Sequence, residues 1–238
     1  AGLYGYNAYL VGLALPTFLA PSPGLWLYVA FAGAVSVPAT MGIANVCRTW
    51  GVAALTAPFV LVTWLFLLAA YAFAGIKGSG LPMVDGIAPI DPAAANPLAV
   101  GDFVQGVIRS IGQVFLKASI VTALLLVAGL AVNSIAAALF GVAGAVVAVA
   151  TAHLLGAESG LITGGLMGFS PVLTAIALGA VFYKPGLRVA VYALAGTIFT
   201  VVVQGAMNVL VTPFGIPTLT GPFVLAAWLF LLPRQEFE

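Results

Sequence analysis

The chain has 238 residues, of which 63% are hydrophobic and 5% are charged, and its formal net charge is +1. A soluble globular domain carries roughly a quarter charged residues, and so few charges would not cover the surface of a soluble protein of this length. The composition therefore predicts an integral membrane protein, and the small net charge indicates no nucleic-acid partner. A single cysteine, Cys47, excludes a disulfide framework.

Apolar segments follow one another along the chain, bounded by glycine, proline or charged residues. A helix needs about 20 apolar residues to cross a bilayer. The apolar runs predict spans near residues 5–20, 25–46, 56–74, 113–132, 134–153, 169–183, 188–210 and 220–233. Between the third and fourth runs, residues 75–102 are rich in proline and glycine and hold three of the six acidic residues. Such a segment is typical of a loop outside the membrane, so the pattern predicts an all-α integral membrane protein.

An internal repeat links the two halves of the chain. Residues 55–68 (LTAPFVLVTWLFLL) match residues 219–232 (LTGPFVLAAWLFLL) at eleven of fourteen positions, with an offset of 164. A weaker pair, residues 1–15 and 164–178, has an offset of 163. Asn45 and Asn208 are also 163 positions apart. Matches in one order and at nearly one offset indicate a duplicated structural unit.

The two copies differ in length at their N-terminal ends. The second copy extends upstream to about Gln113, which lies 55 residues before Gly168, whereas only four residues precede the equivalent Gly5. We therefore expect a first repeat that lacks roughly 50 residues, and ten spans in the complete protein, five in each repeat. An odd number of spans per repeat predicts opposite orientations in the membrane.

This organisation predicts three regions and one orientation. The regions are the remainder of the first repeat at 1–74, an extracytoplasmic linker at 75–102 and the second repeat at 103–238. Cationic residues are enriched on the cytoplasmic side of membrane proteins. The threading that satisfies this rule places these cationic side chains inside: Arg48, Lys184, Arg188 and Arg234. It leaves the acidic 75–102 loop outside and the C-terminus in the cytoplasm.

Residues that could perform chemistry are scarce. His153 is the single histidine, and Glu158 lies five residues after it; the pair is typical of an interfacial polar contact, because a zinc site takes three or four ligands. No nucleophile, metalloprotease or phosphate-loop spacing is present. The sequence therefore predicts no enzyme, no metal and no cofactor. Ion-coupled pumps usually carry charged residues inside their spans, and no acidic residue lies in the middle of a predicted span, which favours passive transport of a neutral solute.

Polar residues at repeated positions are the best site candidates. Thr56 and Thr220 each precede a proline and an apolar run, which is typical of a helix start. Either these threonines only cap their helices, or they lie together at mid-membrane, where two helix N-termini present partial positive charge. Gln113 begins an apolar run, and it is either interfacial or an amide at a pore mouth.

A second set of candidates combines aromatic and leucine side chains. Tyr6 with Leu10, and Phe169 with Leu173, are four residues apart, so each pair lies on one helix face. Tyr6 and Phe169 occupy equivalent positions of the two repeats. Such stripes serve either helix packing or the wall of a pore.

The motifs GLYGYNAYLVGLAL, IGQVFL and the doubled LTxPF followed by WLFLL resemble the urea transporter family, in its bacterial branch. The resemblance covers nearly the whole chain apart from residues 75–102. It implies inverted repeats with broken, half-membrane pore helices. It also implies a homotrimer in the bacterial inner membrane, with channel-like urea flux through a pore in each protomer.

The resemblance also implies roles for individual residues. Thr56 and Thr220 would line the central constriction, and backbone carbonyls of residues 53–55 and 217–219 would form a ladder of acceptors. The walls of two urea slots would come from Tyr6, Leu10, Phe169 and Leu173, with Gln113, Val114 and Leu116 at one slot. Tyr6 stands where the family commonly has phenylalanine, and Leu116 stands where its repeat partner would be aromatic.

Two other functions remain open at this point. One is a channel for another small neutral solute, such as ammonia or a short amide; an ammonia channel would favour pore histidines, and His153 is the single candidate. The other is a membrane scaffold subunit without a pore.

Overall fold

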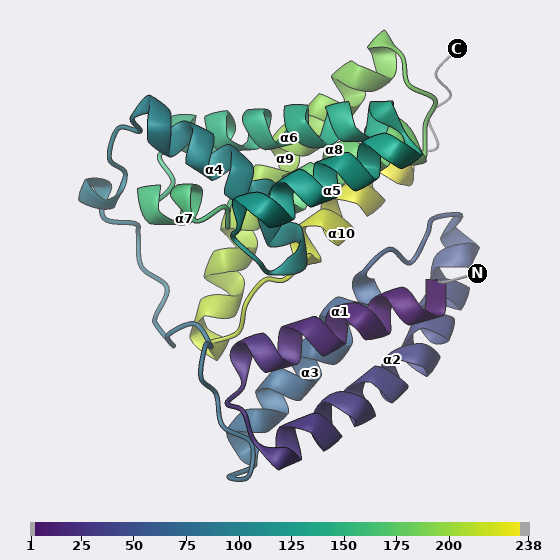
Figure 1. Cartoon of the computed structure of the whole chain (residues 1–238), viewed down its shortest axis with the longest axis vertical. Coiled ribbons are helices and arrows are strands. Elements are labelled where there is room, and N and C mark those ends of the chain that lie inside the picture. Colours follow the sequence, from purple (N-terminus) through teal and green to yellow (C-terminus); the bar gives the residue numbers. More distant parts are fainter. Residues whose placement is uncertain (1–2, 234–238) are drawn as a thin grey trace. The chain divides into compact units, whose positions relative to one another are not determined.

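The computed structural model describes residues 3–233, and its regular structure there is helical apart from an isolated bridge between Leu19 and Gly78 (Figure 1). The expected all-α class is confirmed. The chain forms two compact units. The first comprises the chain up to Ile87 together with Asn208–Val224, and the second comprises Ala88–Met207 together with the residues from Leu225 onward. The first unit therefore contains parts of both sequence repeats, whereas the second contains the end of the linker and the rest of the second repeat.

Three helices form most of the first unit: α1 (Leu3–Phe18), α2 (Pro23–Trp50) and α3 (Ala57–Ala72). Each packs against the other two, and Figure 1 shows them side by side, coloured purple to blue. Helix α2 begins at a proline in its first turn, and the Ser22 hydroxyl accepts the Leu25 N–H at 3.1 Å, which caps the helix. It ends at Gly51, whose φ of 73° is readily adopted by glycine.

The second unit is built around α6 (Ile135–Leu154), which packs against α4, α5, α7 and α8. These neighbours are α4 (Val100–Gly112), α5 (Ile120–Asn133), α7 (Ser159–Thr163) and α8 (Phe169–Ile176). A π-helical turn, Ala177–Val181, continues α8. Small residues on α6 are buried at these contacts, among them Gly141, Gly144 and Ala148, because small side chains let helix backbones approach closely.

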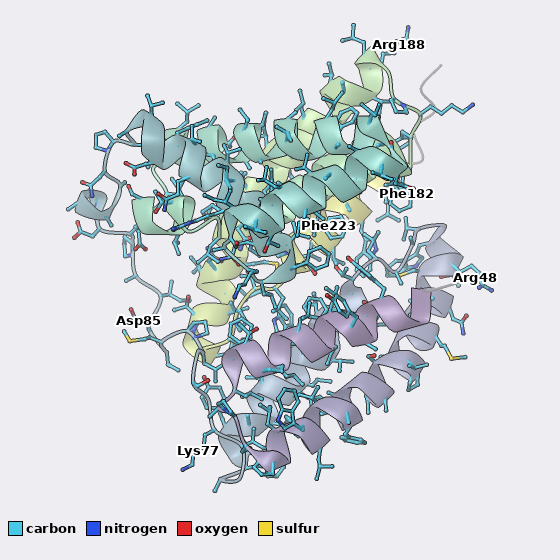
Figure 2. All side chains as sticks on the ribbon, in the orientation of Figure 1. Arg48, Lys77, Asp85, Phe182, Arg188 and Phe223 are labelled. Atoms are coloured by element: carbon cyan, nitrogen blue, oxygen red, sulfur yellow. The ribbon has the colours of Figure 1, made fainter. Side chains whose placement is uncertain are left out.

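Two further helices, α9 (Leu187–Val211) and α10 (Gly221–Leu231), each contribute residues to both units. A 3₁₀ turn, Thr212–Phe214, follows α9 and ends at Gly215. The long connection after α3 contains only a short 3₁₀ turn, Pro92–Ala94. Figure 2 labels Arg48 at the end of α2, and Lys77 and Asp85 on this connection; all three side chains are exposed. Arg234, which the expected orientation also used, lies outside the described residues.

The prediction of one continuous helical span at 113–132 was wrong, because the helix is broken near its start. Gln113 lies at the end of α4, in a 3₁₀ turn, Gln113–Phe115. Leu116 then adopts a left-handed φ of 57°, and α5 begins only at Ile120. The helical segments before and after this break are bent by 72°. Helix α4 was not predicted and overlaps the end of the expected 75–102 loop. Its amphipathic sequence, with Asp102 and Arg109, lacks a continuous apolar run because only one face packs on protein.

Helix length separates the predicted spans into two groups. Among residues 3–233, three helical segments are long and apolar enough to cross a membrane, namely Pro23–Trp50, Ile135–Leu154 and Leu187–Phe214. The bent α4–α5 pair adds a fourth if it counts as one span. Other apolar helices have 10–17 residues, namely Ala57–Ala72, Phe169–Val181 and Gly221–Leu231. At 1.5 Å per residue, these fall short of a hydrocarbon core about 30 Å thick.

Local geometry recurs at the offset of the sequence repeat. The Tyr28 hydroxyl donates to the Phe66 carbonyl at 2.8 Å, and the Tyr192 hydroxyl donates to the Phe230 carbonyl at 2.6 Å. The corresponding ring centroids are 4.8 Å and 5.0 Å apart, with interplanar angles of 55° and 52°. Each residue of the first pair is 164 positions from its counterpart in the second. The repeated sequence therefore forms the same local packing twice.

Candidate functional site

Two buried threonine hydroxyls meet in the first unit. Thr56 immediately precedes α3, Thr220 immediately precedes α10, and their Oγ1 atoms are 2.7 Å apart. The side chains are 3% and 5% exposed. The structure therefore joins the two threonines that the sequence repeat singled out, although they are 164 residues apart.

Each threonine follows a leucine in an unusual backbone conformation. Leu55 has a φ of 53° and Leu219 a φ of 51°. A left-handed residue other than glycine costs roughly 1–2 kcal/mol, and such residues concentrate at functional sites. The turns are closed alike, because Ala57 N–H donates to the Ala54 carbonyl and Gly221 N–H donates to the Thr218 carbonyl, both at 3.1 Å. Both segments thus enter their helices by the same strained turn.

The Thr56 hydroxyl does not cap its own helix. Its side chain makes no hydrogen bond to the first turn of α3; the N–H of Phe59 in that turn instead donates to Asn7 Oδ1 at 3.2 Å. The interpretation of Thr56 as a capping residue alone is therefore wrong, since its hydroxyl bonds to Thr220.

Side chains of α3 hold the segment before Thr220. Trp64 Nε1 donates to the Pro217 carbonyl at 2.8 Å, and the Tyr71 hydroxyl donates to the Gly215 carbonyl at 2.9 Å. Sequence reasoning missed both contacts, although Trp64 lies within the repeated WLFLL motif. Because a carbonyl oxygen has two lone pairs, the Pro217 carbonyl keeps one acceptor position after bonding to the indole.

Tyr6 and Leu10 lie on α1, one turn apart, but differ in exposure. Tyr6 is 43% exposed, whereas Leu10 is 4% exposed and belongs to the core. Leu10 therefore contributes to packing in the first unit.

In the second unit, the turn after α4 lies beside α8. Gln113 Nε2 donates to the Gly164 carbonyl at 3.2 Å. Val114 and Phe169 are buried in one apolar cluster, against which Leu173 packs. Leu116 is half-buried, and its left-handed backbone ends the turn. The structure thus brings together the candidate residues around Gln113 and those around Phe169.

Arg109 and Gln113 bind the last carbonyl of α7 and the first carbonyl of the connection to α8, respectively. Arg109 Nη1 donates to the Thr163 carbonyl at 3.4 Å, and Gln113 donates to the next carbonyl along the chain. The two residues are four positions apart, with Arg109 in the last turn of α4 and Gln113 directly after the helix. Together they attach the end of α4 to the segment that leads into Phe169, while the Gln113 amide oxygen has no protein partner among the described residues.

A family model described as urea transporter matches residues 1–235 of the chain. The chain belongs to the urea transporter family. Curated relatives include Urea transporter 1 of Rattus norvegicus, 26% identical over 99% of the chain, and Urea transporter 1 of Ovis aries, 28% identical over 98% of the chain. The chain spans only 62% and 61% of the lengths of these relatives.

Membership of the urea transporter family, together with several apolar helices, identifies a multi-pass membrane protein. His153, at the end of α6, and Glu158, just before α7, are both exposed. No group of three or more potential metal ligands occurs among residues 3–233. Among the described residues of this family member, the polar contacts of most interest are the buried Thr56–Thr220 pair and the partly buried Gln113 amide.

Proposed function

We propose that the protein is a channel-like passive transporter of urea, with the Thr56–Thr220 pair lining its path. The hydroxyl pair carries the proposal, because two hydroxyls 2.7 Å apart lie buried at the starts of two helices in a member of the urea transporter family. Mammalian relatives named Urea transporter 1 support urea as the substrate.

The chemistry of the pair suits urea. Urea is flat and neutral, with four N–H bonds and one carbonyl, and removing water from an amide costs roughly 2–7 kcal/mol unless hydrogen bonds replace it. Each hydroxyl has one hydrogen and two lone pairs. The mutual bond uses one hydrogen and one lone pair, so the pair still offers a donor to the urea carbonyl and acceptors to its N–H groups.

The surroundings of the pair disfavour cations. Thr56 and Thr220 stand at the N-terminal ends of α3 and α10, where the aligned peptide dipoles of each helix create partial positive charge. Such helix ends exclude protons and cations from narrow pores. A neutral solute meets no such barrier, so the same geometry accepts urea and rejects cations.

The proposed architecture comprises two inverted repeats of about five membrane helices, assembled as a homotrimer in the bacterial inner membrane. The paired Tyr28–Phe66 and Tyr192–Phe230 hydrogen bonds support a repeat with a shared local fold. Short apolar helices support half-membrane pore helices. Exposed Arg48, Lys184 and Arg188 support an orientation with their loops in the cytoplasm.

Urea uptake into proteoliposomes that contain the full-length protein tests this function. Labelled urea should enter faster than into empty liposomes, and competing short amides should slow it only weakly. Ammonia flux without urea flux would identify a different solute. A folded protein without either flux would support a scaffold subunit and overturn the proposal.

We expect urea flux to be non-concentrative and nearly independent of pH between about 5 and 8. The physical reason is the placement of the acidic residues that the structure describes: Asp85 and Asp91 lie on the long connection, Asp102 in the first turn of α4, and Glu158 just before α7. Efflux measured with and without a proton gradient checks this. Accumulation of urea above equilibrium on imposing the gradient would contradict passive transport.

A further inference from the structure

Asn7 is a buried residue whose side-chain amide accepts a hydrogen bond from the helical turn that follows Thr56. It belongs to α1, is 2% exposed, and its Oδ1 accepts the backbone N–H of Phe59 at 3.2 Å. Helices α1 and α3 pack against each other, so the side chain reaches the first turn of α3 from a neighbouring helix. A buried amide is costly unless it is hydrogen-bonded, and here its oxygen serves a backbone group that needs an acceptor.

The first turn of α3 needs one acceptor from outside the helix. The first four N–H groups of any helix lack intrahelical partners. Ala57 N–H donates to the Ala54 carbonyl at 3.1 Å, Pro58 has no N–H, and Val60 N–H donates to the Thr56 carbonyl at 3.0 Å. Only the N–H of Phe59 remains, and Asn7 accepts it. Every N–H in the turn is thereby satisfied without the Thr56 hydroxyl.

Without Asn7, the Thr56 hydroxyl is the natural acceptor for that N–H. Threonine at the position before a helix normally accepts from the second or third N–H of the first turn. Pro58 removes the second, so the Phe59 N–H is the remaining partner. A Thr56 hydroxyl turned toward the Phe59 N–H would lose its hydrogen bond to Thr220 and would no longer face the proposed solute path. The acceptor on Asn7 removes this competition.

We infer that Asn7 is a positioning residue, which caps α3 from α1 and so keeps the Thr56 hydroxyl available to Thr220 and to urea. This inference rests on the proposed function. It predicts that Asn7 affects transport only by controlling the hydrogen bonding of one atom, Thr56 Oγ1. Asn7 itself needs no contact with the solute.

The test compares urea flux per folded protein in four proteins: the wild type, Asn7→Leu, Thr56→Val and the double variant. Leucine has the same branching at Cγ as asparagine but no hydrogen-bond acceptor. Asn7→Leu should lower flux about five- to thirty-fold, as Thr56→Val should. The double variant should conduct like either single variant, because the hydroxyl is already withdrawn. Independent effects would instead multiply.

Conservative and control variants complete the experiment. Asn7→Asp keeps an oxygen acceptor and should restore flux to within about two-fold of the wild type. Ser36→Ala is the matched control, since Ser36 is a fully buried residue of α2 whose hydroxyl donates to the Gly33 carbonyl of its own helix. Its flux should also stay within about two-fold of the wild type. Asn7→Ala replaces the leucine variant if leucine prevents folding.

Three results would overturn the inference: unchanged flux in the folded Asn7 variants that lack an acceptor, a double variant whose loss is the product of the single losses, or a folded Asn7→Asp protein that conducts as poorly as Thr56→Val. A wild-type protein without urea flux would instead overturn the proposed function. The two failures are therefore distinguishable in one set of measurements.

Discussion

Replacing Thr56 or Thr220 with valine should lower urea permeability per folded protein by about five- to thirty-fold. Valine keeps the shape of threonine and removes the hydroxyl. A solute at this point has lost its water, so one missing hydrogen bond raises the barrier by roughly 1–2 kcal/mol. Both side chains are buried and bonded to each other, and removing either hydroxyl deletes the mutual bond as well.

Flux should be measured for both single variants and the double variant, normalised to folded protein. Thr40→Val is the matched control, because Thr40 is also a buried threonine of the first unit, and its hydroxyl donates to the Ser36 carbonyl of its own helix at 2.7 Å. That variant should lose little flux. If all three site variants conduct like the wild type, the threonine pair has a structural role alone.

Replacing Gly165 with alanine should destabilise the second unit by about 2–5 kcal/mol. Gly165 has a φ of 79°, and an added Cβ would lie 2.6 Å from the Ser110 nitrogen and 2.7 Å from the Arg109 carbonyl oxygen. The cost combines left-handed backbone strain with a clash against the backbone of α4, which cannot move aside as a flexible side chain does. The connection held by Arg109 and Gln113 would separate from α4.

This effect is measured by thermal unfolding in detergent, with the yield of folded protein as the readout. Gly156→Ala separates the two causes, because Gly156 has a similar φ of 71° but no atom within 4 Å of an added Cβ. That variant should lose only the strain, about 1–2 kcal/mol. Equal unfolding temperatures for the two variants would show that the close approach of Gly165 to α4 contributes nothing to stability.

The sequence predicted the positions of helices correctly where the apolar runs were long. Predicted spans at 25–46, 134–153 and 188–210 correspond to α2, α6 and α9, because a helix facing lipid or protein on all sides must be apolar throughout. The same rule failed at α4. Its Arg109 donates to the Thr163 carbonyl at the end of α7, a compensation that no local pattern reveals.

By itself, the sequence determined the membrane class, the repeat and the pair Thr56 and Thr220, because composition and self-similarity are properties of the chain alone. It also supported the resemblance to the urea transporter family that the match to residues 1–235 confirmed. It left open whether the threonines cap their helices, since the capping pattern is identical in either case.

Only the tertiary structure decided what each polar group binds. The hydroxyl bond between Thr56 and Thr220 joins residues 164 positions apart, and the Asn7 cap on Phe59 joins residues 52 positions apart. Buried polar groups must find partners, but the chain offers many candidates, and helix packing selects among them by distance. The availability of the Thr56 hydroxyl to Thr220 therefore depends on an asparagine of another helix, which the Thr-Ala-Pro motif by itself does not reveal.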